Sequence, residues 1–319
     1  MESPVDGGGE FGALKDPSSL VFGSYGNTPE APHGKTILVT QETSRCATDI
    51  ALIVLDRTFD DPVLAPIRLD APPAVGDSLT AVGYGSTSTG ANQEGVRQER
   101  AVTVLALGPV PEDSTYPAVA PNFFVVGEAL CSGDSGGPAI AASGAVVGVA
   151  SYLNNPTVEF PTSTPSDCIG ASVHDVYENT SADRALILSA YAAVQATLWL
   201  EGQPDPRAQL KDFAAACGDD GECKSNVCVT NPSGTKACSH SCLGGVACPT
   251  GYACNDDGTR QRCALEAVDL APSVKEHNNT GCNIAISGSV PGPAVSLGVL
   301  FALRWRRRFR SRHRKKRLV

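Results

Sequence analysis

The stretch Cys131-Ser-Gly-Asp-Ser-Gly-Gly-Pro138 is the most informative part of this sequence. A serine hydroxyl attacks a carbonyl group efficiently only when a base takes its proton and hydrogen-bond donors stabilise the oxyanion. Gly133 permits a tight backbone turn, so the N–H groups of Gly133 and Ser135 can point at one position. Gly136 and Gly137 keep side chains away from an approaching substrate. The stretch therefore predicts Ser135 as a nucleophile, and Gly133 with Ser135 as its oxyanion hole.

Short β-type segments flank this stretch on both sides, separated by Gly, Pro, Asp or Asn. The chain contains 32 Gly and 23 Pro, which suits many short strands joined by turns. Residues 182–200 instead lack Gly and Pro and have apolar residues at helical spacing after a capping Ser181. We therefore expect an all-β domain over residues 1–200, closed by one helix, with strands at Thr36–Thr40, Ile50–Leu55, Leu79–Tyr84, Ala101–Leu107, Phe123–Val126, Ala139–Ala141 and Val146–Tyr152.

Three motifs together resemble the trypsin/chymotrypsin family of serine proteases. They are the stretch around Ser135, the segment Asp49-Ile-Ala-Leu52, and the segment Val146–Tyr152. The resemblance implies a double β-barrel, whose first barrel is incomplete here, followed by a C-terminal helix. It also implies an endopeptidase that cleaves protein or peptide substrates through an acyl-enzyme at Ser135, without a metal or another cofactor.

The same resemblance assigns roles to further residues. Asp49 would orient the histidine that serves as base, and it stands 86 residues before Ser135, an interval that suits the family. Asp134 matches the residue that pairs with the new N-terminus after zymogen cleavage. Cys131 and Cys168 would form a disulfide that braces the specificity pocket.

In trypsin-like enzymes, an aspartate six residues before the nucleophile selects a basic P1 residue. Ala129 occupies that position here, beside Leu130, so we expect an uncharged P1 residue, small or apolar. Glu128 would take the position only if the register slipped by one residue. The strand that pairs with the substrate backbone would present Ser151, Tyr152 and Leu153, and the last of these would narrow the pocket.

The histidine that this family places before the aspartate is missing from its expected motif. His33 is the only histidine upstream of Asp49, and its Pro-His-Gly setting is a poor one for a base, which a rigid neighbourhood must hold. One explanation is a catalytically inactive, protease-like binding protein. The other, which we favour, is that the sequence begins downstream of the true start, because no signal peptide precedes the domain and Cys46 lacks a partner. In either case we expect the chain as given to hydrolyse peptides poorly or not at all.

Eight of the twelve cysteines lie within residues 217–263. Such density predicts a small module held by disulfides and formed in an oxidising compartment. Zinc is the alternative, but the paired C-x2-C spacing typical of zinc sites is absent. The module resembles small extracellular cysteine-rich repeats found beside bacterial surface enzymes, and polar linkers at 201–216 and 264–281 flank it.

Residues 282–319 have the pattern of a membrane anchor. Residues 284–303 carry no charge, and residues 304–319 contain ten Lys or Arg. This arrangement predicts one membrane-spanning helix with its basic end in the cytoplasm and the protease at the cell surface. Thr280-Gly-Cys282 with the span resembles a myxobacterial-type C-terminal sorting signal, which implies processing or attachment at Cys282. A plain single-pass anchor and a flexible basic tail are the alternatives.

The charge is divided between the body of the chain and its tail. Without the ten basic residues of the tail, residues 1–303 contain 15 basic and 34 acidic residues. So acidic a body argues against nucleic acid as a partner.

Overall fold

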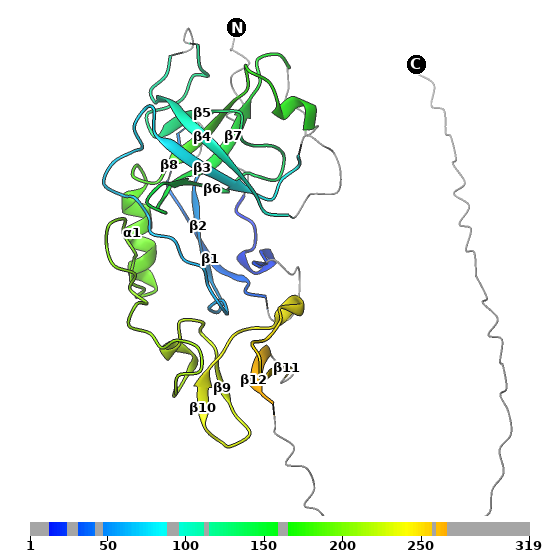
Figure 1. Cartoon of the computed structure of the whole chain (residues 1–319). Coiled ribbons are helices and arrows are strands. Elements are labelled where there is room, and N and C mark those ends of the chain that lie inside the picture. The colour runs from blue at the N-terminus through cyan, green and yellow to red at the C-terminus, as the bar shows by residue number, and fades with distance from the viewer. Residues whose placement is uncertain are drawn as a thin grey trace, which may run out of the picture. The chain divides into compact units, whose positions relative to one another are not determined.

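The computed structural model describes residues 13–23, 31–41, 47–87, 96–111, 115–158, 165–256 and 260–266 (Figure 1). Cys46, Cys282, the expected span at 284–303 and the basic tail lie outside these ranges. Within them, no helix is both long and apolar enough to cross a membrane.

Six antiparallel strands close into a barrel between residues 78 and 179. The order around the barrel is β3-β4-β5-β8-β7-β6, so β3 pairs with both β4 and β6 (Figure 1). The predominantly β fold that the sequence predicts is therefore confirmed for this part of the chain. The strands are β3 (Ser78–Gly83), β4 (Gln98–Leu107), β5 (Phe123–Gly127), β6 (Pro138–Ala141), β7 (Val146–Asn154) and β8 (His174–Asn179).

Large side chains fill the interior of the barrel. The rings of Phe124 and Tyr177 stack with their centroids 5.4 Å apart, and both side chains are fully buried. Val104 and Val126 pack in the same cluster and have no exposed surface. Gly148 lies against this ring pair, and a Cβ atom there would collide with the ring of Phe124. The barrel therefore has a continuous apolar core, which is the main source of stability in a domain of this size.

The described residues before the barrel form a much smaller sheet. Strands β1 (Gly34–Val39) and β2 (Ala51–Leu55) pair with each other in antiparallel fashion, from Gly34 opposite Leu55 to Val39 opposite Ala51. No residue of β2 is fully buried. A short 3-10 helix, Pro17–Ser19, precedes β1.

The helix after the barrel is shorter than the sequence predicts. It is α1 (Arg184–Ala193), whereas apolar spacing and the absence of Gly and Pro suggested a helix over 182–200. The predicted cap is also wrong, because Ser181 donates its hydroxyl to Asn179 (2.6 Å) and Asp183 is the residue that precedes the helix. Beyond the helix the backbone N–H of Ile67 donates to the carbonyl of Trp199 (2.9 Å). That pairing holds the chain in an extended form, which helical spacing alone does not reveal.

The cysteine-rich module contains two β-hairpins and four disulfides, which confirms a disulfide framework. The zinc alternative is wrong, because all eight sulfur atoms are in disulfides and none can act as a thiolate ligand. Cysteine side chains also supply much of its buried interior. The disulfides are Cys217–Cys228, Cys223–Cys238, Cys242–Cys254 and Cys248–Cys263. The hairpins are β9 (Cys228–Thr230) with β10 (Lys236–Cys238), and β11 (Tyr252–Asp256) with β12 (Gln261–Leu265).

Residues just before the module are hydrogen-bonded to it. The N–H of Lys211 donates to the carbonyl of Glu222 (2.8 Å), and that of Ala214 donates to Cys238 (2.8 Å). Part of the segment 201–216 is therefore structured against the hairpins. Three further 3-10 helices lie at Pro165–Cys168, Asp220–Glu222 and Leu243–Gly245.

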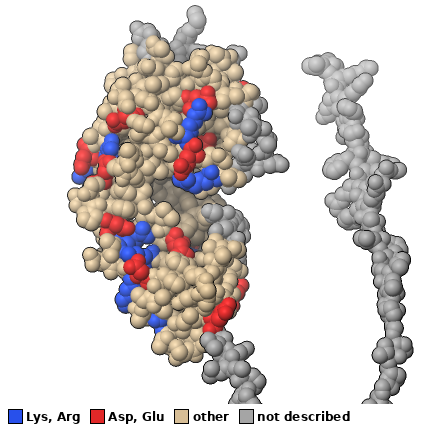
Figure 2. Space-filling view, in the orientation of Figure 1, with Lys and Arg blue, Asp and Glu red and all other residues tan. Residues whose placement is uncertain are grey.

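On the face shown in Figure 2, basic and acidic side chains lie next to one another. Among the ion pairs of the barrel, Arg97–Glu99 lies along β4, and Arg100–Glu128 joins β4 to the segment that follows β5. Such a surface lacks the single-sign field that would attract a polyanion. The exclusion of nucleic acid nevertheless stays a prediction from composition.

Candidate active site

Ser135 lies in the turn that leads into β6, and its side chain is exposed. Two backbone hydrogen bonds shape this turn: Asp134 N–H to Cys131 (3.0 Å) and Gly137 N–H to Asp134 (2.9 Å). Gly133 has a φ of 95°, a conformation that a residue with a Cβ atom rarely adopts. Among the described residues, the N–H groups of Gly133 and Ser135 donate to no protein acceptor. The predicted oxyanion donors therefore remain open to a ligand.

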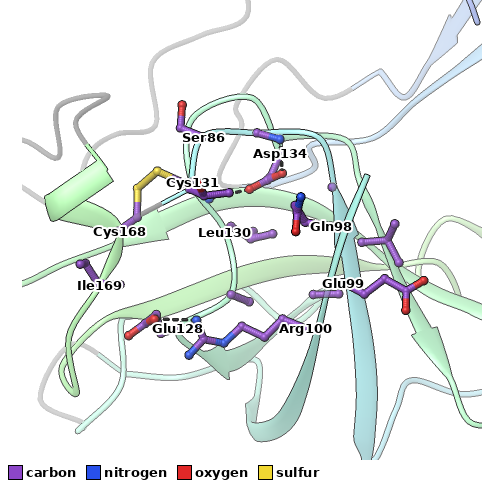
Figure 3. Close-up of a pocket in the computed structure, with 16 residues that line it drawn as sticks. Ser86, Gln98, Glu99, Arg100, Glu128, Leu130, Cys131, Asp134, Cys168 and Ile169 are labelled. Atoms are coloured by element: carbon purple, nitrogen blue, oxygen red, sulfur yellow. Dashed lines mark hydrogen bonds and ion pairs between the residues drawn. A yellow bond between two sulfur atoms is a disulfide. The ribbon is translucent and has the colours of Figure 1, made fainter. Parts of the chain in front are cut away.

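Asp134 anchors this turn to the barrel. One carboxylate oxygen accepts the N–H of Gly85 (2.7 Å), and the other accepts the N–H of Cys131 (2.8 Å; Figure 3). A Cβ atom on either Gly83 or Gly85 would collide with this carboxylate, so glycine is required at both positions. The pairing of Asp134 with a new N-terminus, which the family resemblance implies, stays a prediction.

Asp49 lies beside the strand that we expect to pair with substrate. Ser151 donates its hydroxyl to Oδ2 of Asp49 (2.6 Å). The ladder between β7 and β8 shifts register between Ala150 and Tyr152, so Ser151 sits at an irregularity of β7. A bulge of this kind turns a side chain out of the regular alternation. Here it lets Ser151 reach Asp49, which is 102 residues away along the chain.

The Ser135 turn is tied to the same point of β7. Gly136 donates its N–H to the carbonyl of Ala150 (2.9 Å), and Ala150 donates its own to Gly137 (2.8 Å). Ala150 directly precedes Ser151. The structure therefore brings the turn of the predicted nucleophile and the carboxylate of Asp49 to one place, although they belong to different sheets.

A buried carboxyl group, Glu178, holds the Asp49 segment against the barrel. It accepts hydrogen bonds from the backbone N–H of Asp49 and from the hydroxyl of Thr48 (2.9 Å). Asn122 also donates to it (2.7 Å). Burial, and then the negative charge of Asp183, raise the pKa of Glu178 to about 8. Glu178 is therefore protonated at neutral pH and shares a hydrogen bond with Asp183.

None of the three histidines among the described residues is hydrogen-bonded to Asp49 or Ser135. His33 exchanges hydrogen bonds with Asp56, at the opposite end of β2 from Asp49. Seven residues of extended chain separate these two ends by about 20 Å. The other two lie against aromatic rings: His174 edge-on to Tyr116, and His240 stacked on Phe213.

Three of the residues expected at the specificity pocket, Ala129, Leu130 and Leu153, lie around Asp175, which the sequence analysis missed. Its Oδ2 accepts the N–H groups of Ala129 (2.5 Å) and Leu130 (2.7 Å). Leu153 is the direct partner of Asp175 in the pairing of β7 with β8. Of the other two expected residues, Tyr152 is exposed, and Ser151 donates its hydroxyl to Asp49.

A cavity of about 180 Å³ adjoins residues 128–131 (Figure 3). The disulfide Cys131–Cys168 borders it, and its formation agrees with the pairing that the resemblance implies. Glu128 also borders it, and its carboxylate pairs with Arg100 (2.6 Å) and with the N–H of Gly170 (2.9 Å). Both oxygens of Glu128 therefore already have partners, which makes its carboxylate a poor replacement for the aspartate that selects a basic P1 residue in trypsin-like enzymes.

Comparison with known families gives a match to one family model, described as Trypsin, over residues 23–164. The matched region includes Asp49, the Ser135 turn and the barrel strands from β3 to β7. A search of curated proteins found no match to the chain. The family match and the geometry agree, and together they support the trypsin-like serine protease family for this part of the chain.

Proposed function

We propose that the chain is a serine-type endopeptidase displayed at the cell surface. The observation that supports this proposal is that Asp49, Ser151 and the Ser135 turn lie at one place. A nucleophile, two free oxyanion donors and a carboxylate able to orient a base are what acyl transfer requires.

Each group of the site has one part in acyl transfer at Ser135. A base takes the proton of the Ser135 hydroxyl as Oγ forms a bond with the scissile carbonyl carbon, while the N–H groups of Gly133 and Ser135 receive the oxyanion. The bond to the leaving amine then breaks, the amine takes the proton, and an acyl-enzyme remains. Water hydrolyses this ester and restores Ser135. Asp49 positions the base, which the described residues do not supply.

A catalytically inactive binding protein is the second candidate, because no described histidine is hydrogen-bonded to Asp49 or Ser135. Chemical rescue separates the two functions. Imidazole in solution can take the place of a missing imidazole side chain when the remaining groups are already in position. The assay is ester hydrolysis by the purified 319-residue chain, using activated esters with cationic, apolar and small P1 groups, with and without imidazole.

For an endopeptidase site, we expect imidazole to raise hydrolysis at least tenfold over a Ser135→Ala control measured at the same imidazole concentration. This comparison removes the reaction of imidazole with the ester. Asp49→Asn should lower the rescued rate, because the incoming imidazole loses its orienting carboxylate. Equal rates for the native chain and Ser135→Ala, with and without imidazole, would contradict the endopeptidase function and favour the binding protein.

The location at the cell surface belongs to the same proposal. Four disulfides in the module favour an oxidising compartment, which supports export of the chain. A membrane-spanning segment at 284–303 and processing at Cys282 remain proposals drawn from the sequence. Mass spectrometry of the mature C-terminus tests them, since cleavage or modification at Cys282 distinguishes a sorting signal from a plain anchor or a flexible tail.

A further inference from the structure

Residues 59–62, which follow β2, are partly buried, although their neighbours on either side are exposed. They are covered by the cysteine-rich module and by the segment that precedes it. The carbonyl of Phe59 accepts the side-chain amide of Asn226 (3.0 Å), and that of Pro62 accepts a guanidinium N–H of Arg207 (2.8 Å). Residues distant in sequence therefore hold this short segment at both of its ends.

Asp61 makes the most contacts of the segment. Its N–H donates to the carbonyl of Ser225 (2.7 Å), and one carboxylate oxygen accepts the N–H of Ser241 (2.6 Å). The other carboxylate oxygen pairs with Nδ1 of His240 (2.7 Å), whose ring stacks on Phe213. The module therefore uses the backbone N–H of Asp61 and both oxygens of its side chain.

Both halves of the module contribute to this surface. Ser225 and Asn226 precede β9, whereas Arg260, which pairs with Asp60 (3.3 Å), precedes β12. Arg260 also pairs with Asp220 (2.9 Å) in the first half of the module. The two halves are thus joined to each other at the place where they meet the chain that follows β2.

The backbone conformation of two residues shows that this contact is specific. Asp61 (φ 49°) and Asn226 (φ 56°) are two of the four non-glycine residues with a left-handed backbone in the described ranges. This conformation costs free energy in a residue that has a Cβ atom, and it persists where surrounding contacts impose it. The two residues lie on opposite sides of the contact, and Asp61 bonds to Ser225, the neighbour of Asn226.

We infer that the cysteine-rich module positions Asp49 by holding the far end of β2. Asp49 lies just before this strand, and residues 59–62 lie just after it. A two-stranded sheet is only marginally stable by itself, and no side chain of β1 or β2 is fully buried. Glu178 and Ser151 hold the first end of β2 through Asp49, and the module holds the second. The inference rests on the proposed function in so far as Asp49 orients the base.

Hydrogen exchange in the full chain tests this role. Asp61→Gly and Asn226→Gly each remove side-chain hydrogen bonds of the contact, and glycine adopts the left-handed backbone without strain. Gln195→Gly is the matched control, because Gln195 has the same conformation (φ 55°) and is exposed. We expect the amides of residues 49–55 to exchange at least tenfold faster in the two contact variants and at the native rate in the control. The amides of β5 should keep the native rate in all three.

Asn226→Gly is the decisive variant, because it changes the module and leaves the protease segment intact. A folded Asn226→Gly chain with native exchange in residues 49–55 would overturn the inference and favour a module that acts only as a spacer or binds another molecule. Equal acceleration in β5 would overturn it as well, since the whole domain would then be opening.

The native chain offers a measurement that needs no variant. Because the N–H of Asp61 donates to Ser225, it should exchange at least a hundredfold more slowly than the same amide in the unfolded chain. A smaller protection would contradict a lasting contact between the module and this segment.

The effect on Asp49 can be measured separately, by imidazole rescue of ester hydrolysis. Asn226→Gly should lower the rescued rate at least threefold, because Asp49 then holds the incoming imidazole less well. In a chain that already carries Asp49→Asn, the same change should have no further effect. An equal loss in both backgrounds would reflect a loss of folded protein and contradict positioning through Asp49.

The two proposals can fail independently. A native chain without imidazole rescue would refute the endopeptidase, while hydrogen exchange would still decide whether the module holds β2. Rescue of the native chain together with native exchange in Asn226→Gly would keep the endopeptidase and refute the role of the module.

Discussion

The barrel β3–β8 and the two-stranded sheet β1–β2 carry the two halves of the candidate site, and they are built differently. The barrel encloses fully buried side chains such as Phe124 and Val126. In the two-stranded sheet no side chain is fully buried, and Val39 is 39% exposed. The Ser135 turn thus has a core beneath it, whereas Asp49 depends on polar contacts with the barrel through Glu178 and Ser151.

The two sheets should differ most in how far the removal of one side chain lowers the free energy of unfolding. Phe124→Ala removes a fully buried ring that stacks on Tyr177 and packs beneath Gly148. We expect a loss of about 3–5 kcal/mol in the free energy of unfolding, as for other buried aromatic residues. Urea denaturation followed by tryptophan fluorescence and circular dichroism measures it. The control is Val39→Ala in β1, which should cost less than about 0.5 kcal/mol because the side chain is partly exposed. Equal costs for the two variants would show that the sheets share one core.

The contact between the two sheets should depend on pH through Glu178. Its pKa is about 8 in the folded protein and near 4.5 when unfolded, so its stabilising effect is complete below about pH 4.5 and is lost as the pH rises through 8. Glu178→Gln stays neutral, so stability should fall less between pH 5 and pH 8 than in the native chain. At pH 5 the variant should lie within about 1.5 kcal/mol of the native chain, the value of one hydrogen bond.

Thermal unfolding at several pH values measures this effect. Glu99→Gln, at an exposed position of β4, is the matched control and should retain the native pH dependence. Part of the fall will remain in Glu178→Gln, because burial also raises the pKa of Asp175. A Glu178→Gln profile identical to that of the native chain would show that the contact with Asp49 does not depend on the protonation of Glu178.

The sequence predicted those features that depend on local conformation. The turn at Ser135 requires glycines at fixed positions, and the runs at Phe123–Val126 and Val146–Tyr152 have the composition of buried strands, so both were visible without a structure. The helix was placed correctly but made too long. Its last expected turn is replaced by the pairing of Trp199 with Ile67, a contact across more than 130 residues that the local pattern does not contain.

Asp175 and Glu178 could not be found in this way. The segment His174–Asn179 has only two apolar residues, Val176 and Tyr177, and the sequence analysis predicted no strand there, yet five of its six residues are buried. An acidic residue in a strand is usually solvated, and only closure of the barrel places these two side chains inside. Their roles depend on what β5, β7 and the Ala129–Leu130 segment bring to them, which is tertiary information.

The module after the barrel has a consequence for how this chain can change over evolutionary time. Its eight cysteines form two sets of four, and the first joins the third and the second joins the fourth within each set. Corresponding cysteines of the two sets are 25 or 26 residues apart, and no disulfide connects one set with the other. The module is therefore a tandem repeat of a cassette that is closed by its own two disulfides. A cassette can be gained or lost by recombination without leaving an unpaired cysteine, so the number of cassettes after the barrel can change in whole units.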